Sequence, residues 1–290
     1  MPWLIAMAVH VLLGSLLALW VRHVSSVNKN AFFSMAFFNY LVVLIGGTAL
    51  AMYFNNWSIP SIPTGRAVIY LLVEGILLPM AWVLNYKLIS MVGAANSVIA
   101  GTAGIIATTV LGIIFLHEPA SVKYFAGACL MVFAIYISFS INADEKHKQV
   151  GSIWLKTSLI FGVATLTALG LIFEKKAISS IGYSSYYCYG WGMQCLGAFV
   201  IMLALGRDEL RSISVKTAKY GLSIGLLTVI TGSLFVYALS KGALSSAILF
   251  TSSKISITVV LAAILLKERN DFAKRILALL LSLAGLVLIL

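Results

Sequence analysis

The sequence has few charged residues and very few acidic ones. Only 10% of its 290 residues are Asp, Glu, Lys or Arg, and nine of those are acidic. Soluble domains carry about 25% charged residues. The hydrophobic fraction is 61%, and a water-soluble fold of this length would have no means of covering so much apolar surface. These values exclude an ordinary soluble domain and favour a protein whose outer surface faces lipid.

Other scarce features exclude further classes. Cys129, Cys188 and Cys195 lie inside apolar segments and fit neither a disulfide framework nor a metal spacing. No Gly-rich loop of the Walker type occurs, which argues against direct use of ATP. The four histidines are scattered and the loops hold no cluster of carboxylates, so we expect no enzyme, no metal and no other cofactor. A repeated filter-like segment, which would favour a channel, is also missing.

Long apolar segments are abundant instead. A bilayer core of roughly 30 Å is crossed by about 20 apolar residues in a helix, and segments of that length recur along the whole chain. We therefore predict an all-α integral membrane protein with ten transmembrane helices. They are expected at about 3–21, 31–54, 67–86, 94–116, 121–141, 153–174, 184–206, 218–239, 243–266 and 272–290.

The chain repeats itself. A shift of 150 residues aligns the fourth and fifth predicted helices with the ninth and tenth, and brings Glu118 onto Glu268. A shift of 154 aligns the first loop, at 22–27, with the sixth, at 176–181. Five helices in each copy would make the two copies point opposite ways, which is a common architecture among transporters.

The predicted organisation is therefore two inverted repeats joined by a short connection. The first five-helix repeat spans 1–141, a connecting loop spans 142–152, and the second five-helix repeat spans 153–290. Transporters of this design place the substrate site at the interface of the repeats, near the membrane midplane.

The segment after the fourth predicted helix carries a family resemblance. Its residues at 115–119 read Phe-Leu-His-Glu-Pro and are followed by Gly127-Ala128; Leu-Lys-Glu-Arg at 266–269 is a second copy. This pattern resembles the Leu-Gly-Glu-Pro and Gly-Ala motif of the EamA-type family of the drug/metabolite transporter superfamily, and departs from it at His117 and Lys267. The resemblance implies a solute carrier or exporter with ten helices. Members handle amino acids, drugs, sugars, nucleotide sugars and phosphorylated metabolites, so it does not name the substrate.

The net charge of +11 indicates membrane topology. Loops on one side of the predicted helices hold 14 Lys and Arg residues, and those on the other side hold five. The positive-inside rule puts the first set in the cytoplasm and both termini outside, although many members of the family are described with both termini inside. We expect a multi-pass protein of the bacterial inner (plasma) membrane, whose partners are the bilayer and a small-molecule substrate. No nucleic acid is expected. A single chain suffices, and a homodimer is compatible with the pattern.

Two charged residues fall near the middle of predicted helices. Lys254 lies near the centre of 243–266, and Glu74 lies in 67–86. A charge at the bilayer centre costs at least about 2.5–3.5 kcal/mol, so such residues need a partner or a wet cavity. Lys254 is a candidate to receive an anionic group of the substrate. Alternatively it pairs with Glu74, in a bridge that breaks during transport or in a permanent bridge. Glu174, beside two lysines at a predicted helix end, is expected to be interfacial.

Polar and aromatic residues near these two charges complete the candidate substrate site. Trp82 and Tyr86 are four residues apart, and share a helix face with each other and roughly with Glu74. The substrate-binding candidates are Lys254, Glu74, Trp82, Tyr86, Asn96, Thr102, Tyr237, Phe250 and Ser253. Glu74 and His10 are the candidates for proton coupling, because imidazole titrates near neutral pH.

These features predict a secondary active transporter that works by alternating access around a central site between the repeats. Its substrate is expected to be a small polar metabolite with a carboxylate or phosphate. The alternative is an exporter of cationic drugs or amines, with Glu74 as the carboxylate that binds the cation and couples protons.

Overall fold

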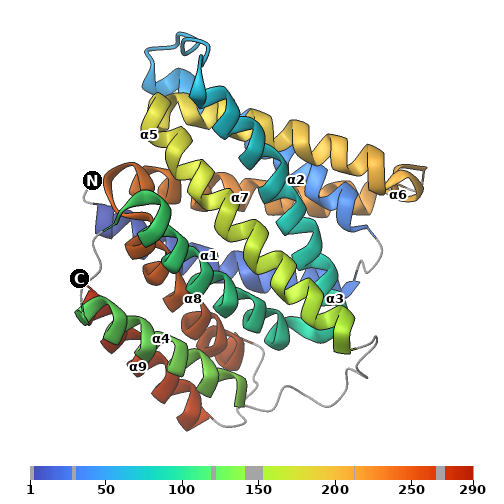
Figure 1. The fold of residues 1–290 in the computed structure, drawn as a ribbon. Coiled ribbons are helices and arrows are strands. Elements are labelled where there is room, and N and C mark those ends of the chain that lie inside the picture. The colour runs from blue at the N-terminus through green and yellow to red at the C-terminus, as the bar shows by residue number, and fades with distance from the viewer. Residues whose placement is uncertain are drawn as a thin grey trace.

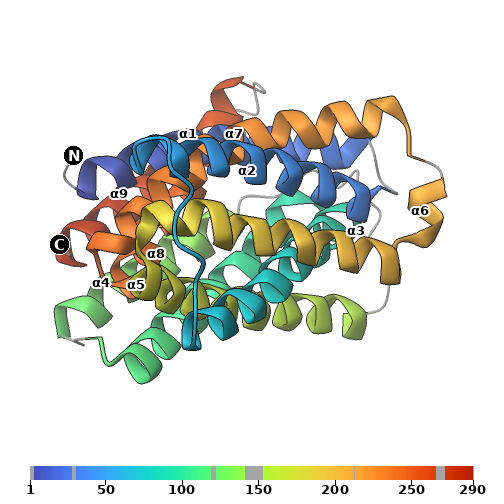
Figure 2. The same cartoon turned by 90° about the horizontal axis from the view of Figure 1, so that it is seen from above.

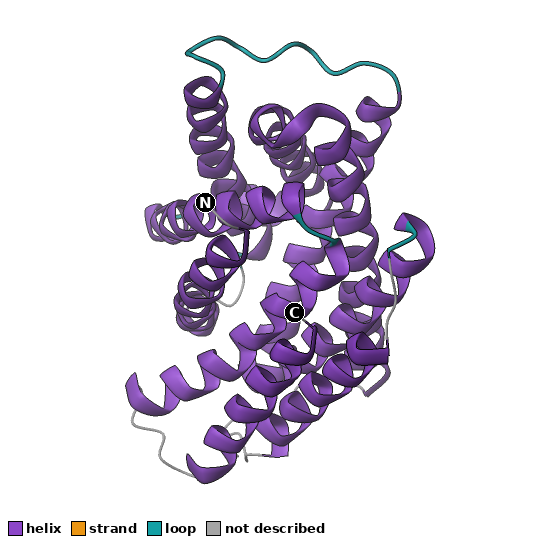
Figure 3. Cartoon of the chain, turned by 90° about the vertical axis from the view of Figure 1, so that its left-hand side faces the viewer, coloured by secondary structure: helices purple, strands orange, loops and turns teal. Residues whose placement is uncertain are grey.

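The computed structural model describes residues 3–27, 31–118, 122–140, 153–211, 213–265 and 272–289. Every regular element in these ranges is an α-helix (Figure 3). The predicted connecting loop at 142–152 and Glu268 lie outside the described residues. The helices are α1 (Trp3–Val27), α2 (Phe32–Phe54), α3 (Arg66–Leu116), α4 (Val122–Ser140), α5 (Ile153–Leu205), α6 (Arg207–Arg211), α7 (Val215–Lys241), α8 (Leu244–Leu265) and α9 (Phe272–Ile289).

Five stretches of the described helices are long and apolar enough to cross a membrane. Their mean hydropathy lies between 1.6 and 2.3, because few charged residues interrupt them. The predicted all-α class is thus confirmed for the described residues. The stretches are Trp3–Val21, Phe32–Phe54, Arg66–Leu88, Ser158–Leu205 and Val215–Lys241.

Helix α3 contains two of the predicted spans. Its backbone is helical through the connection expected at 87–93, so a non-helical loop there was a wrong prediction. Even so, Tyr70 and Phe115 line one cavity, whereas a straight helix would place them roughly 67 Å apart at about 1.5 Å per residue. The helix must therefore reverse its direction. Figure 1 shows a teal first arm and a green second arm that meet at the lower right.

Helix α5 also contains two predicted spans, and here the break is visible in the backbone. Gly182 has φ 76° and ψ 157°, a conformation that only glycine adopts without strain, and divides the helix into two. The first part continues to Ile181 instead of ending at the predicted 174. Glu174 therefore lies well inside a helix rather than at its end.

The helices pack around a large apolar core and three smaller apolar clusters in the described ranges. α3 runs along α5, α2 packs against α5 and α7, and α1 packs against α7 and α8. α4 and α9 lie side by side (Figure 1), and the start of α1 and the end of α9 are at the same end of the bundle (Figure 2). The core includes the buried side chains of Tyr186, Tyr187 and Trp191, together with residues of α1, α2, α3, α7 and α8.

Small residues allow the helices to approach closely. The spacing of Gly221 and Gly225 predicts close helix packing, and the structure confirms it: a Cβ atom at either glycine would lie 2.6 Å from a side chain of α2. Between α5 and α3 the approach is closer still, because a Cβ at Gly197 would overlap the carbonyl oxygen of Gly75. These contacts hold in place the helices that carry the buried polar residues.

Candidate functional site

Lys254 lies at the junction of α8 and α1. A Cβ atom at Gly14 would be 2.9 Å from its Cδ atom and 3.8 Å from its Nζ atom, so the glycine leaves room for the lysine chain. The Ser15 hydroxyl donates to the backbone carbonyl of Lys254 at 3.2 Å, and the Thr258 hydroxyl donates to the same carbonyl at 2.7 Å. Helix α1 thus holds the backbone that carries the lysine.

His10 lies on the same helix as Gly14 and is 8% exposed. Its Nδ1 atom is 2.9 Å from the carbonyl oxygen of Thr231 on α7. Since a carbonyl only accepts, Nδ1 carries the proton, and a neutral ring then has its lone pair on Nε2. That Nε2 atom is buried with no hydrogen-bond partner, and the ring interacts electrostatically with Lys254. Lys254 and His10, both predicted candidates, therefore form one polar group between α1, α7 and α8.

Glu74 belongs to a second polar group, between α3 and α5. Its side chain is fully buried. Oε2 accepts a hydrogen bond from the Tyr186 hydroxyl at 3.0 Å, and the Gln194 amide donates to that hydroxyl oxygen, also at 3.0 Å. Oε1 is buried and has no partner. One oxygen of the carboxylate is therefore held by a directed chain of donors, and the other is not.

Glu174 joins this second group, which corrects its predicted interfacial position. Its side chain is 5% exposed, and its carboxylate interacts electrostatically with Glu74 and Tyr186. Tyr40 on α2 interacts with both carboxylates. The prediction was wrong because α5 continues past 174, so that the helix carries Glu174 inward.

The predicted pairing of Lys254 with Glu74 is not present. No ion pair joins the two side chains, and their neighbours differ: Lys254 has His10 and Gly14, while Glu74 has Tyr186 and Glu174. A permanent bridge between the two charges is therefore excluded as the reason for their burial. Lys254 lies between α1, α7 and α8, whereas Glu74 lies between α3 and α5.

The aromatic candidates mainly contact other aromatic rings. Trp82 and Tyr86 share a face as predicted, with ring centroids 5.4 Å apart, and the buried Tyr86 hydroxyl has no hydrogen-bond partner. Tyr237 meets Tyr183 edge-on at 5.6 Å. Trp82 and Tyr86 are on the same helix as Glu74. Tyr237 lies beside the break in α5, because its partner Tyr183 follows Gly182.

Two other candidates, Phe250 and Ser253, contribute little to either group. Phe250 is buried in the apolar core. The Ser253 hydroxyl donates to the carbonyl of Phe250 at 2.7 Å, so its own helix satisfies it. Asn96 and Thr102 lie in α3, and their side chains are outside the described residues.

The residues that sequence reasoning missed are Tyr186 and Glu174. Gln194 is recognisable in the sequence as a polar residue in the middle of an apolar segment, but a tyrosine gives no such signal. Tyr186 lies 112 residues from Glu74, and a single sequence carries no pattern that joins them.

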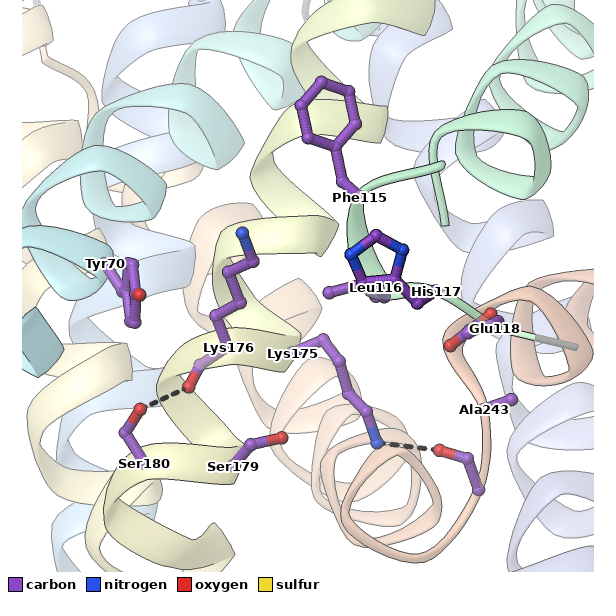
Figure 4. Close-up of a pocket in the computed structure, with 11 residues that line it drawn as sticks. Tyr70, Phe115, Leu116, His117, Glu118, Lys175, Lys176, Ser179, Ser180 and Ala243 are labelled. Carbon is purple, nitrogen blue, oxygen red and sulfur yellow. Dashed lines mark hydrogen bonds between the residues drawn. The ribbon is translucent and has the colours of Figure 1, made fainter. Parts of the chain in front are cut away.

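A separate cavity of about 550 Å³ lies where α3, α5 and the turn between α7 and α8 meet (Figure 4). Residues 115–118 of the family-like motif line it. Glu118 accepts from the backbone amides of Leu244 at 2.5 Å and Ser245 at 2.9 Å, and from the Ser245 hydroxyl. Lys175 donates to the carbonyl of Gly242 at 2.7 Å. The glutamate thus caps the start of α8 and the lysine caps the end of α7, so both charged groups have hydrogen-bond partners within the fold.

No group of three or more His, Cys, Asp or Glu side chains in the described ranges is arranged to hold a metal ion. Neither of the two polar groups lines the cavity of Figure 4.

Comparison with known proteins identifies the fold alone. The chain is similar to a solved crystal structure of a protein at a TM-score of 0.74 and 11% sequence identity, over 98% of this chain and 96% of that one. At this identity the likeness extends to the fold and not to an activity. Neither a family model nor a curated protein matches the sequence.

Proposed function

We propose that the protein is a multi-pass membrane carrier with ten transmembrane helices in two inverted five-helix repeats. Support for ten spans comes from α3 and α5, which each contain two predicted spans. Support for the repeat comes from α4 and α9, which pack together and begin at Val122 and Phe272, 150 residues apart. The EamA-like motif at 115–119 supports the same architecture by resemblance.

The carrier transports a small polar metabolite that bears a carboxylate or phosphate, by alternating access around a central site. One observation carries this proposal: a lysine in the middle of an apolar helix has no counter-charge in the described part of the chain, and lies near a buried histidine with an unpartnered nitrogen. An ammonium without a partner is costly in lipid, and an anionic ligand would remove that cost. The His10 nitrogen would accept a hydrogen bond from the same ligand.

The test is thermal unfolding of the purified protein with a panel of amino acids, organic and sugar phosphates, nucleotides, polyamines and quaternary amines. A ligand at about 100 times its dissociation constant stabilises the folded state by about 2.7 kcal/mol. We expect stabilisation by anionic ligands, lost in Lys254→Ala. Stabilisation by an anion that persists unchanged in Lys254→Ala would contradict the proposed site.

Gly14→Ala provides a variant that keeps the side chains of both Lys254 and His10. The new Cβ would lie 2.9 Å from the Lys254 Cδ, and the flexible lysine chain would move aside. We expect weaker anion binding with nearly unchanged stability. Gly162→Ala is the matched control, since its Cβ would make an ordinary contact of 3.7 Å with Leu84.

A second candidate function is the export of cationic drugs or amines. Glu74 and Glu174 favour it, because two carboxylates are buried together with no ion-paired basic side chain in the described ranges. In this case cations would stabilise the protein, Lys254→Ala would leave that effect intact, and Glu74→Gln would remove it.

A further inference from the structure

Two carboxyl groups are buried in the same region of the protein, and no basic side chain in the described ranges forms an ion pair with them. Glu74 on α3 is fully buried, and Glu174 on α5 is 5% exposed. They interact electrostatically with each other, and the Tyr186 hydroxyl interacts with both. The titratable groups that face them from the neighbouring helices are Tyr40 on α2 and Tyr186 on α5, neither of which brings a positive charge.

Physical chemistry limits what this pair can be. Two ionised carboxylates placed together in an apolar interior repel one another and are poorly solvated, so both cannot remain charged. Glu74 also has one buried oxygen, Oε1, with no hydrogen-bond partner. A single proton on the pair would remove one of the two negative charges and would give this oxygen a hydrogen to bind.

We propose that Glu74 and Glu174 form a proton-binding pair that holds one shared proton, with Tyr186 as the donor to Glu74. Gln194 donates to Tyr186, and Tyr186 donates to Oε2 of Glu74. This direction leaves Oε1 of Glu74 as the oxygen available to the shared proton. Because the two groups interact strongly, the proton belongs to the pair and not to one residue.

The pair is separate from the Lys254–His10 group, and its use in transport rests on the proposed carrier function. If the protein is a carrier, release of the proton would leave the pair with a second negative charge in an apolar interior. That unfavourable state would favour the conformation in which water reaches the pair. The presence of the shared proton itself does not depend on transport.

The test is infrared spectroscopy of the purified protein at neutral pH, where a protonated carboxyl group has a C=O stretching band distinct from that of a carboxylate. The wild type should show a band equal to one carboxyl group. The double variant Glu74→Gln/Glu174→Gln should lose it and still fold, because glutamine has the shape of a protonated glutamate. Glu209→Gln is the matched control for the same change outside the pair: this carboxylate accepts from the backbone amides of Phe32 and Ser34 at 3.0 Å.

Tyr186→Phe tests the contribution of the tyrosine hydroxyl separately from that of the two carboxyl groups. It removes the donor to Glu74 and should shift the frequency of the band. An unchanged frequency would remove Tyr186 from the proposal. The shared proton would be overturned if the wild type lacked the band or if the band survived in the double variant. It would also be overturned, in favour of a metal-cation site, if the band appeared only when Na⁺ is replaced by a bulky organic cation. If no solute is transported but the band behaves as described, the carrier function fails and the proton pair stands.

Discussion

Glu118 accepts hydrogen bonds from both the backbone amide and the hydroxyl of Ser245, 127 residues further along the chain. The acceptor follows α3 and the donor begins α8. A carboxylate here satisfies amides that the first turn of α8 leaves without partners, and it lies at the favourable end of the helix dipole. The residue at the centre of the family-like motif therefore joins two distant parts of the fold.

Replacement of Glu118 should destabilise the protein. Glu118→Ala leaves the amides of Leu244 and Ser245 without their acceptor, and we expect a loss of about 1–3 kcal/mol of unfolding free energy. Ser245→Ala should cost less, because both amides keep the carboxylate. Thermal unfolding in detergent measures both variants. Equal stability of Glu118→Ala and the wild type would show that the cap contributes nothing.

Lys254 and Glu74 should contribute independently to stability. Since no ion pair joins them, the free energies of Lys254→Ala and Glu74→Gln should add to within about 0.3–0.5 kcal/mol in the double variant. Unfolding titrations of the wild type, both single variants and the double variant measure this. A double variant that recovers more than about 1 kcal/mol would mean that the two charges meet in another populated conformation.

Gly197 should be intolerant of any side chain. Its Cβ would overlap the backbone carbonyl of Gly75, which cannot move aside as a flexible side chain can. Gly197→Ala should therefore force α3 and α5 apart and cost at least about 1–3 kcal/mol. Gly192→Ala, five residues earlier in α5, is the matched control, because its Cβ would lie 3.5 Å from Leu44 Cδ1 in ordinary contact. A similar melting temperature for both variants would contradict the close approach.

The location of the C-terminus tests the charge-based topology. The excess of Lys and Arg on one set of loops predicts that both termini lie outside the cytoplasm. A reporter enzyme that folds only in the cytoplasm should be inactive when fused after Leu290, and one that is active only outside should work there. The opposite result would reverse the topology and agree with the usual description of the resembling family.

The sequence predicted some residues of the two polar groups and not others. Lys254 and His10 stand out because a charge or an imidazole in an apolar helix is costly, and the structure brings them together. Glu74 stands out for the same reason, but the bridge to Lys254, one of the alternatives for it, is not present in the structure. A lone sequence shows which side chains are expensive to bury and does not show which of them share a neighbourhood. Opposite charges suggested a bridge, and the packing of α3 against α5 put a second carboxylate beside Glu74 instead.

The sequence by itself determined the helical class, the apolarity of the helices, and the positions of most of their ends. These properties follow from local composition, because lipid-compatible helices need runs of apolar residues and satisfy their own backbone groups. Only the tertiary structure decided the reversal within α3, the break at Gly182, the partners of Glu74 and the capping role of Glu118. Each of these depends on contacts between residues far apart in the chain, such as Glu118 with Ser245, and such contacts leave no mark in local composition.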